Sequence, residues 1–195
     1  MVELKIEHIT KYVPLRARIN EVLTKDTVGT NKSSNLSLID GCIDYASSIA
    51  LNTINGYGQI RDILVSNDDI KRCVISAVDA QLILKIFFRG PVTMHYISFS
   101  CDRKPQEMDA SQPKTMHIFT NRPELDFLEA DHIEPLQKIV LDTNSINRKH
   151  RLSGTKFSNI TNIQLYIVDN IGNKNHTFIN ELVLWGCQYK KAGDW

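Results

Sequence analysis

The chain has 195 residues, of which 42% are hydrophobic and 23% charged, and its formal net charge is +1. This length suits one domain that buries a stable core without metal or disulfide staples. The near-neutral charge gives no electrostatic footprint for nucleic acid or an anionic membrane, and the longest apolar runs are far too short to span a bilayer, so we expect neither as a partner.

The first 35 residues carry the weakest pattern. Four apolar residues recur at helical spacing after Pro14, namely Leu15, Ile19, Val22 and Leu23. Residues 27–35 are small and polar, as in a linker. We predict a short helical or flexible extension over residues 1–35, which packs back on the domain or docks on a partner. The domain itself is predicted over residues 36–189, followed by a tail over residues 190–195.

Strand patterns follow the extension. Residues 36–51 are compatible with one strand or with a turn of helix around Asp44, and residues 52–59 contain turn residues throughout, which predicts a loop. Further along, short apolar segments bounded by turn residues predict a series of strands. The predicted strands are residues 73–75, 81–88, 92–100, 115–120 and 137–141. Gly90 and Pro91 are expected to separate the second of these strands from the third.

The longer connections are predicted to be surface loops. Residues 101–113 are charged and contain two prolines, and residues 142–154 are polar. Residues 125–135 form an acidic and irregular connection, in which we expect Phe127 and Leu128 to anchor the chain on the core.

Residues 157–186 carry the clearest strand pattern. Three apolar residues alternate with three others, as in a strand with one buried face: Ile163, Leu165 and Ile167 against Gln164, Tyr166 and Val168. The polar residues 169–176 predict a loop, and the apolar run 177–185 predicts a strand that returns beside the first. Trp185, in that returning strand, is expected in the core or half-buried, whereas Trp195 ends a polar tail. The whole series of strands predicts an antiparallel sandwich or barrel.

Four ordered blocks carry a family resemblance. The first is Ala50-Leu51-Asn52, and the second is residues 76–88 (SAVDAQLILKIFF). The third is residues 118–130 (IFTNRPELDFLEA), followed by Pro135 and Gln137. The fourth is the stretch 157–186, with anchors at Asn170, Gly172, Thr177, Ile179 and Gly186. In these blocks the chain resembles the PITH domain, the C-terminal domain of thioredoxin-like proteins that associate with the proteasome.

The resemblance implies an all-β fold, a jelly-roll-like antiparallel β-sandwich of galactose-binding-like architecture. It also implies an interaction role without catalysis, with a protein partner such as the regulatory particle of the 26S proteasome. Ala77 and Ala80 stand where the family has acidic residues. Because no W-C-x-x-C motif is present, the chain resembles the stand-alone PITH-domain proteins.

Polar residues of the blocks are expected to have structural roles. Asp79 precedes a strand and is expected to accept hydrogen bonds from local backbone N–H groups. Asn121 with Pro123 is expected to fix a tight turn. Asn159 and Asn170 are expected to satisfy backbone groups at strand ends, because an unpaired buried polar group costs roughly 1–3 kcal/mol.

Candidate chemistry is sparse. His95 and His117 lie on separate predicted strands that could place them side by side in a sheet, and a third metal ligand would have to be Cys101 or Asp102. An enzyme would need both histidines and a carboxylate in one pocket. No G-x-S-x-G, H-E-x-x-H, P-loop or G-x-G-x-x-G motif is present, and Ser98 near His95 does not make a triad. We therefore predict no catalytic, cofactor-binding or metal-binding residues.

The cysteines and the N-terminus indicate a compartment. Cys42, Cys73, Cys101 and Cys187 are dispersed without a C-x-x-C pair, and we expect reduced, buried thiols. Residues 1–11 are mixed in charge and lack the apolar segment of a secretion signal. We expect a cytoplasmic, or cytoplasmic and nuclear, protein that is monomeric and has no cofactor.

Two functions from different classes remain. The first is a non-enzymatic protein–protein interaction module, whose partner-binding residues the sequence does not identify. The second is a small-ligand or glycan-binding module, which rests on architecture and on Tyr57, a loop aromatic between Gly56 and Gly58 and outside the family blocks.

Overall fold

The computed structural model describes residues 37–38, 40–65 and 73–189. These residues belong to the second of two units into which the chain divides, residues 34–195. The predicted extension over residues 1–35 and the tail over 190–195, with Trp195, lie outside the described residues, and their boundaries stay predictions.

Antiparallel strands dominate the described chain, with two short α-helices and two 3₁₀ turns. The strands are β1 (Ser37–Leu38), β2 (Ile43–Leu51), β3 (Val74–Ile75), β4 (Leu82–Ser100), β5 (Ala110–Ser111), β6 (Pro113–Thr120), β7 (Gln137–Val140), β8 (His150–Arg151), β9 (Ile160–Asn170), β10 (His176–Ile179) and β11 (Glu181–Gln188). The helical elements are η1 (Asp40–Cys42), α2 (Ile60–Leu64), α3 (Phe127–His132) and η2 (Gly154–Phe157). No helix in these ranges is long and apolar enough to cross a membrane.

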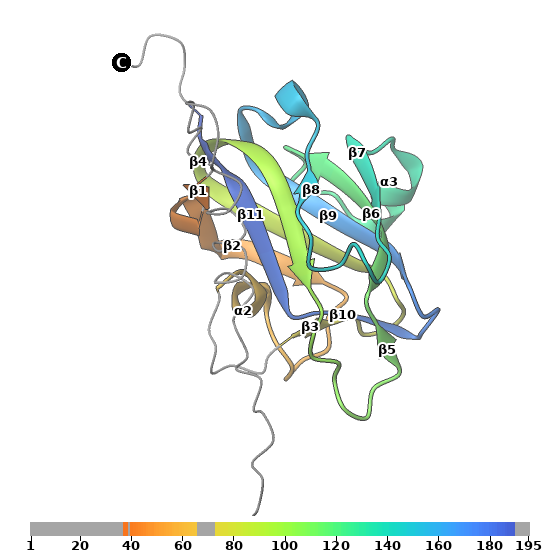
Figure 1. Ribbon diagram of the computed structural model, residues 1–195. Coiled ribbons are helices and arrows are strands. Elements are labelled where there is room, and N and C mark those ends of the chain that lie inside the picture. The colour runs from red at the N-terminus through yellow and green to blue at the C-terminus, as the bar shows by residue number, and fades with distance from the viewer. Residues whose placement is uncertain (1–36, 39, 66–72, 190–195) are drawn as a thin grey trace, which may run out of the picture. The chain divides into compact units, whose positions relative to one another are not determined.

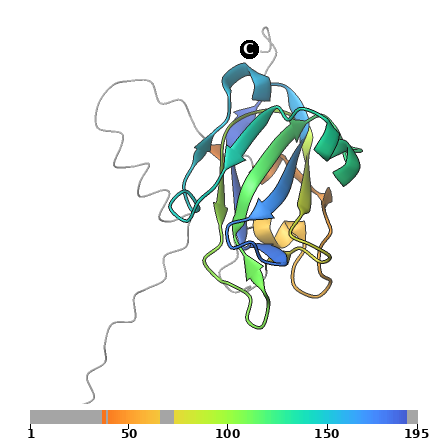
Figure 2. The same ribbon diagram turned by 90° about the vertical axis from the view of Figure 1, so that its right-hand side faces the viewer.

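One large, curled sheet makes both layers of a sandwich. Its order is β1-β11-β4-β9-β6-β7, and β2 and β8 pair with the two halves of β4. Strands β3, β10 and β5 form a small second sheet, which closes the lower end of the sandwich in Figure 1. Figure 2 shows β6 and β7 from the side, with α3 next to them. The predicted all-β, antiparallel sandwich is confirmed.

Strand β4 connects the two layers. It runs through Gly90 and Pro91 as one strand of 19 residues, so the prediction of two strands separated there was wrong. Its ladder with β9 shifts register between Phe87 and Val92, and the strand folds over in this region (Figure 1). Pro91 is tolerated because it lies at this register shift, where the ladder does not use the N–H that proline lacks, and its carbonyl still accepts a hydrogen bond from Tyr189 N at 2.8 Å.

Strand β9 lies at the centre of the sheet. The predicted hairpin with the returning strand was wrong, because β4 lies between β9 and β11, and the intervening β10 pairs with β3 and β5. One face of β9 packs in the main core through residues such as Leu165. The other face is covered as well, because Gln164 and Tyr166 are fully buried. The expectation of a single buried face was therefore also wrong.

Strand β2 runs over Ile43–Leu51, which confirms the strand alternative, and the chain makes an irregular turn within the strand after Asp44. The Asp44 carboxylate accepts hydrogen bonds from Ala46 N at 3.1 Å and Ser47 Oγ at 2.6 Å, and the register with β4 shifts at this turn. Ser48 Oγ then accepts a hydrogen bond from Phe87 N at 3.1 Å. The ladder therefore continues past the turn.

The predicted connections contain more structure than expected. Residues 52–59 form the predicted loop but lead into α2, and the loops 101–113 and 142–154 contain the short strands β5 and β8. The connection 125–135 contains α3, with Leu125 and Ala130 buried, and Phe127 packs half-buried against the same core cluster, as predicted. Leu128, predicted as an anchor, is 70% exposed. Sequence periodicity misses α3 because six residues are less than two helical turns.

Candidate interaction surface and loop pocket

Asn52, just after β2, organises the loop between β3 and β4. Its Nδ2 donates to Asp79 Oδ1 at 2.9 Å and to the Gln81 carbonyl at 2.7 Å, and its Oδ1 accepts from Val78 N at 3.0 Å. Asp79 Oδ1 also accepts from Gln81 N at 2.9 Å, which confirms the structural role predicted for this carboxylate. The loop therefore presents Val78 from a fixed backbone.

A buried phenol links this loop to α3. Gln81 Nε2 donates to Tyr166 Oη at 2.8 Å, and Tyr166 Oη donates to Asp131 Oδ1 at 2.7 Å. Burial, together with the Asp131 carboxylate, raises the pKa of the Tyr166 phenol well above its usual range. The phenol therefore stays a neutral donor and joins Gln81, just before β4, to Asp131 in α3.

Helix α3 has its own cap. Asp126 Oδ1 accepts a hydrogen bond from Glu129 N at 2.7 Å at the start of the helix. Glu129 also forms an exposed ion pair with Arg122 at 2.9 Å. A carboxylate followed three residues later by glutamate is a helix-start signal, and this pattern in the sequence points to α3 where periodicity fails.

The turn before α3 is bound to the sheet. Asn121 has a left-handed backbone with φ of 56°, and its Oδ1 accepts from Thr161 N at 2.8 Å, which confirms the predicted turn. Lys85, only 7% exposed on β4, donates its Nζ to the Pro123 carbonyl at 2.9 Å. Both contacts hold the segment before α3 on the outer face of the sheet.

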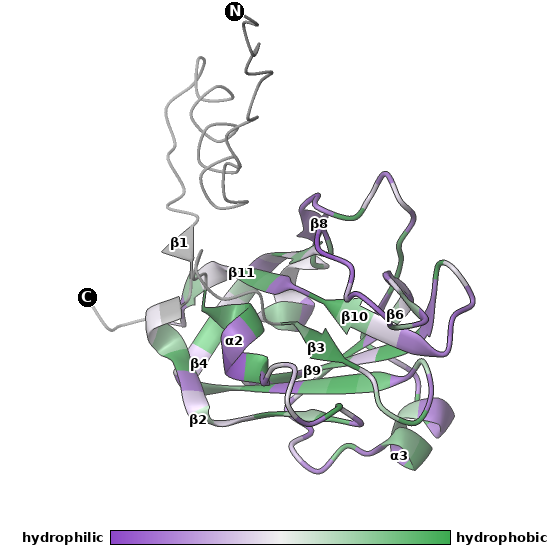
Figure 3. Ribbon diagram, turned by 90° about the horizontal axis from the view of Figure 1, so that it is seen from below, coloured by the Kyte–Doolittle hydropathy of each residue, from purple (hydrophilic) through white to green (hydrophobic). Residues whose placement is uncertain are grey.

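This scaffold exposes apolar side chains. Val78 is 87% exposed and Leu128 is 70% exposed, while the half-buried Phe127 ring packs edge-on against Tyr166 at 6.0 Å between ring centroids. Val78 and Phe127 line the same hollow of about 410 Å³, and a second hollow of about 410 Å³ adjoins Leu128. We use the name Val78–Leu128 face for Val78, Phe127 and Leu128 together with the polar residues that line the two hollows. These polar residues are Asn52, Asp79, Gln81, Asp126, Glu129 and His132. Figure 3 shows α3 on the outside of the domain, with hydrophilic residues beside hydrophobic ones.

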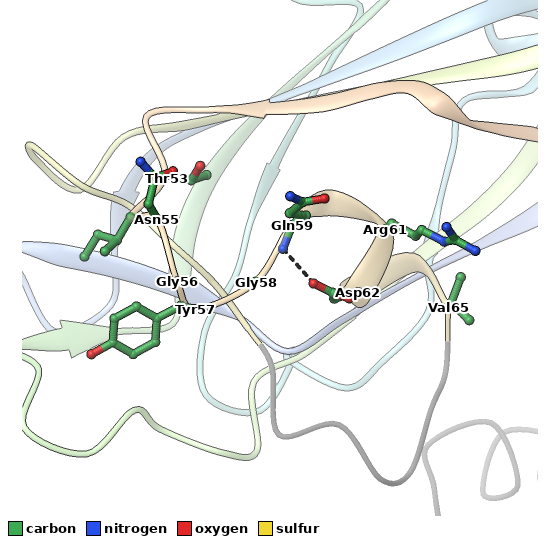
Figure 4. A pocket seen from close by; sticks show the side chains of 10 residues that line it. Thr53, Asn55, Gly56, Tyr57, Gly58, Gln59, Arg61, Asp62 and Val65 are labelled. Atoms are coloured by element: carbon green, nitrogen blue, oxygen red, sulfur yellow. Dashed lines mark hydrogen bonds between the residues drawn. The ribbon is translucent and has the colours of Figure 1, made fainter.

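A separate pocket of about 620 Å³ lies over the loop between β2 and α2 (Figure 4). Its lining is Thr53, Ile54, Asn55, Gly56, Tyr57, Gly58, Gln59, Arg61, Asp62 and Val65. Gln59 N donates to Asp62 Oδ2 at 2.8 Å, which fixes the start of α2. Tyr57 and Arg61 lie toward opposite ends of the lining and are both exposed. Hydroxyl, amide and charged groups around one hollow suit a polar small molecule.

The structure does not bring the two candidate histidines together. His117 on β6 is level with Tyr166 on β9, which is level with Ile83 at the start of β4. His95 lies beyond the bend of β4, on the half that pairs with β11. The side chain of His117 packs edge-on against Tyr166, and burial lowers the pKa of its imidazole. In the described ranges, no group of three or more His, Cys, Asp or Glu residues is arranged to hold a metal ion.

Other candidate residues have local roles. Cys101 donates its Sγ to the Phe178 carbonyl at 3.4 Å, and Asp102 accepts from Asn147 Nδ2 at 2.7 Å. Asn170 Nδ2 donates to the Lys174 carbonyl at 2.9 Å, as predicted for a strand end. Asn159 instead contributes through its backbone, which is left-handed with φ of 57°.

The remaining candidates divide by burial. Trp185 is buried in β11 as predicted, and Ser98 is buried on β4. All four cysteines are free thiols, but only Cys73 and Cys101 are buried, whereas Cys187 is exposed and Cys42 half-buried. The prediction that all four thiols are buried was therefore wrong for Cys187 and Cys42.

Comparison with known proteins gives a family and a fold. A family model described as the PITH domain matches residues 29–194. Thioredoxin-like protein 1 of Schizosaccharomyces pombe is 27% identical over 152 residues, which cover 76% of this chain and 50% of that protein. The chain thus spans about half the length of this curated relative.

Two solved structures share the architecture. The family 32 CBM from C. perfringens NanJ, in complex with galactose, has a TM-score of 0.55 at 9% identity and covers 77% of this chain and 98% of its own. CBM32-3 from a family 31 glycoside hydrolase of Clostridium perfringens has a TM-score of 0.52 at 13% identity. The match covers 81% of this chain and 99% of the CBM32-3 chain. At these identities the likeness shows the fold, a galactose-binding-like β-sandwich.

Proposed function

The chain belongs to the PITH-domain family, and on this premise we propose that it is a non-catalytic protein–protein interaction module. The observation that carries the proposal is the Val78–Leu128 face, which exposes two aliphatic side chains on a hydrogen-bonded scaffold. An isolated exposed aliphatic residue needs no explanation, but apolar side chains rimmed by polar ones are typical of interaction sites. Fixing the loop and the helix beforehand lowers the ordering cost of binding.

The partner we propose is the regulatory particle of the proteasome. The resemblance to the PITH domains of proteasome-associated thioredoxin-like proteins supports this choice. A cytoplasmic or nuclear location and a monomeric state belong to the same proposal.

An affinity pull-down from a cell lysate, read by mass spectrometry, tests the proposal. The baits are the wild-type chain, a Val78→Asp/Leu128→Asp variant, and Val140→Asp as a control, since Val140 is 62% exposed on β7. We expect regulatory-particle subunits with the wild type and the control, and their loss with the double variant. If a different protein is captured by the wild type and the control but not by the double variant, the chain is an interaction module with that protein as its partner. Equal capture by all three baits would show that this face is not the interface.

The loop pocket favours a second candidate function, the binding of a polar small ligand or glycan. The family 32 CBM with the same fold was solved in complex with galactose, and Tyr57 offers an exposed ring in a lining that also contains Asn55 and Gln59. A glycan array, followed by titration with galactose under NMR observation, tests this candidate. Binding that is abolished by Tyr57→Ala would support this candidate. An array without signal would leave the interaction module as the remaining candidate function.

A further inference from the structure

Helix α3, which carries Phe127 and Leu128 of the Val78–Leu128 face, lies in an acidic segment of the described chain. Residues 121–136 contain five acidic residues against one arginine, a net charge of −4. The acidic residues are Glu124, Asp126, Glu129, Asp131 and Glu134. Because the whole chain carries +1, the remaining residues together carry +5. The negative charge is therefore local to the segment that contains α3.

Most of this charge is available to a partner. Within the described residues, Glu129 is the one member of the five in an ion pair, and that pair also neutralises Arg122. Asp126 and Asp131 each accept one hydrogen bond and are exposed, so their carboxylates keep free acceptor positions. Glu124 and Glu134 are exposed as well.

The negative charge of this face favours some kinds of binding partner over others. A second copy of the chain would place the same negative patch against itself in a two-fold interface, which like-charge repulsion disfavours. An acidic segment meets the same repulsion. A basic segment gains from long-range attraction and from pairing at the rim, while apolar side chains between its charges cover Val78 and Leu128.

Building on the proposed function, we propose that the Val78–Leu128 face binds a partner segment in which aliphatic or aromatic side chains are flanked by lysine and arginine. The apolar side chains contact Val78, Phe127 and Leu128, and the basic ones approach the carboxylates of Glu124, Asp126 and Glu134. Because the carboxylates are exposed, the electrostatic part of the binding weakens as salt is raised.

A random peptide library displayed on phage tests this inference with the 195-residue chain as target. Counter-selection on Leu128→Asp removes peptides that bind elsewhere. We expect enriched sequences that carry apolar anchors and a net positive charge. A synthetic consensus peptide should bind the wild type and lose affinity about tenfold with Glu124→Lys/Glu134→Lys, which reverses two exposed charges that flank α3 in the sequence.

Matched controls separate the possible failures. Glu107→Lys reverses an exposed charge on a different loop and should leave the affinity within about twofold of the wild type. Neutral or acidic consensus peptides would contradict the proposed basic partner segment. Binding that is lost with Leu128→Asp but unchanged with Glu124→Lys/Glu134→Lys would contradict it too. In both cases the Val78–Leu128 face would remain the binding site. An absence of enriched peptides would also overturn the inference. The proposed function is tested independently by the lysate pull-down. It would be contradicted if the Val78→Asp/Leu128→Asp variant captured the same proteins as the wild type.

Discussion

At the residue scale, asparagine side chains set the course of the backbone at several turns. Five of the described non-glycine residues with positive φ are asparagines: Asn52, Asn121, Asn147, Asn159 and Asn173. Asparagine tolerates the left-handed region better than most residues, because its short amide can bond nearby groups. At Asn52 and Asn121 the same amide also bonds a second segment, so each residue fixes a turn and its neighbour at once.

Asn52 offers a clear test of this double role. Asn52→Ala loses three hydrogen bonds and places a Cβ-bearing residue without a compensating amide at φ of 62°. We expect the free energy of unfolding to fall by about 2–4 kcal/mol. Asn52→Gly keeps the backbone geometry and should lose less. Urea unfolding measures both, with Asn55→Ala in the exposed loop as a control expected within about 0.5 kcal/mol of the wild type. Equal stability of Asn52→Ala and Asn55→Ala would refute the assigned role.

His117 gives the domain a pH dependence of defined sign. Burial lowers the pKa of His117 in the folded chain, and its Nδ1 has no hydrogen-bond partner among the described residues. Below about pH 6.5 the unfolded chain binds a proton here that the folded chain does not, so the free energy of unfolding falls as the pH drops. His150 has a pKa shift in the same direction, also caused mainly by burial.

The variant His117→Gln removes the contribution of His117 to this pH dependence and leaves that of His150. Between about pH 7.5 and 5.5 we expect its free energy of unfolding to fall less steeply than that of the wild type. Urea unfolding at a series of pH values measures the slope. Carboxylates with lowered pKa, such as Asp44, act only below their ordinary range near pH 4 and leave this window unaffected. Identical slopes for variant and wild type would contradict the prediction.

At the element scale, the sequence predicts where strands run better than what they pair with. Alternating apolar residues identify β9, and short apolar segments bounded by turn residues identify β6 and β7, because both patterns are local. Pairing is not local: nothing in residues 157–186 shows that β4 lies between β9 and β11. The same limit explains Gly90 and Pro91, which signal a break in a local pattern, whereas the structure uses them at a bend within β4.

Gly186 shows how tightly two of these strands approach. A Cβ built at Gly186 would collide with the carbonyl oxygen of Thr93, at the point where β11 shifts its register on β4. Gly186→Ala should therefore lower the free energy of unfolding by about 1–3 kcal/mol, as overpacking does in closely packed cores. Thermal and urea unfolding measure the loss. Gly90→Ala is the matched control, because a Cβ there meets no atom within 4 Å. A Gly186→Ala protein as stable as Gly90→Ala would refute the close approach.

At the scale of the whole molecule, the all-β sandwich was predictable and the interaction surface was not. The family blocks carry the fold because their polar residues, such as Asn52, Asp79 and Asn121, bond the backbone. The Val78–Leu128 face comes from two segments about 50 positions apart in the sequence, joined through the Tyr166 phenol. Tyr166 appears in the sequence only as one alternating residue of a strand, so its bonds to Gln81 and Asp131 had no local signal.

Thiol labelling reports on the stability of the whole sandwich. Burial raises the pKa of Cys73 to about 11, and that of Cys101 further above its usual range, so neither thiol forms a reactive thiolate readily in the folded chain. Cys187 is exposed on β11 and Cys42 is half-buried. With a thiol reagent near pH 8, we expect Cys187 to react first and Cys42 more slowly. All four thiols should react in denaturant under non-reducing conditions.

Cys73 and Cys101 both belong to the main core cluster, although Cys73 directly precedes β3 and Cys101 directly follows β4. If the sandwich opens as one cooperative unit, both thiols become accessible only through the same global unfolding, and their labelling rates give the same opening free energy. We expect this value to equal the free energy of unfolding measured with urea. Mass spectrometry of peptides after timed labelling assigns each rate. Faster labelling of Cys73 than of Cys101 would instead show that the end of the sandwich near β3 opens independently of the layers joined by β4.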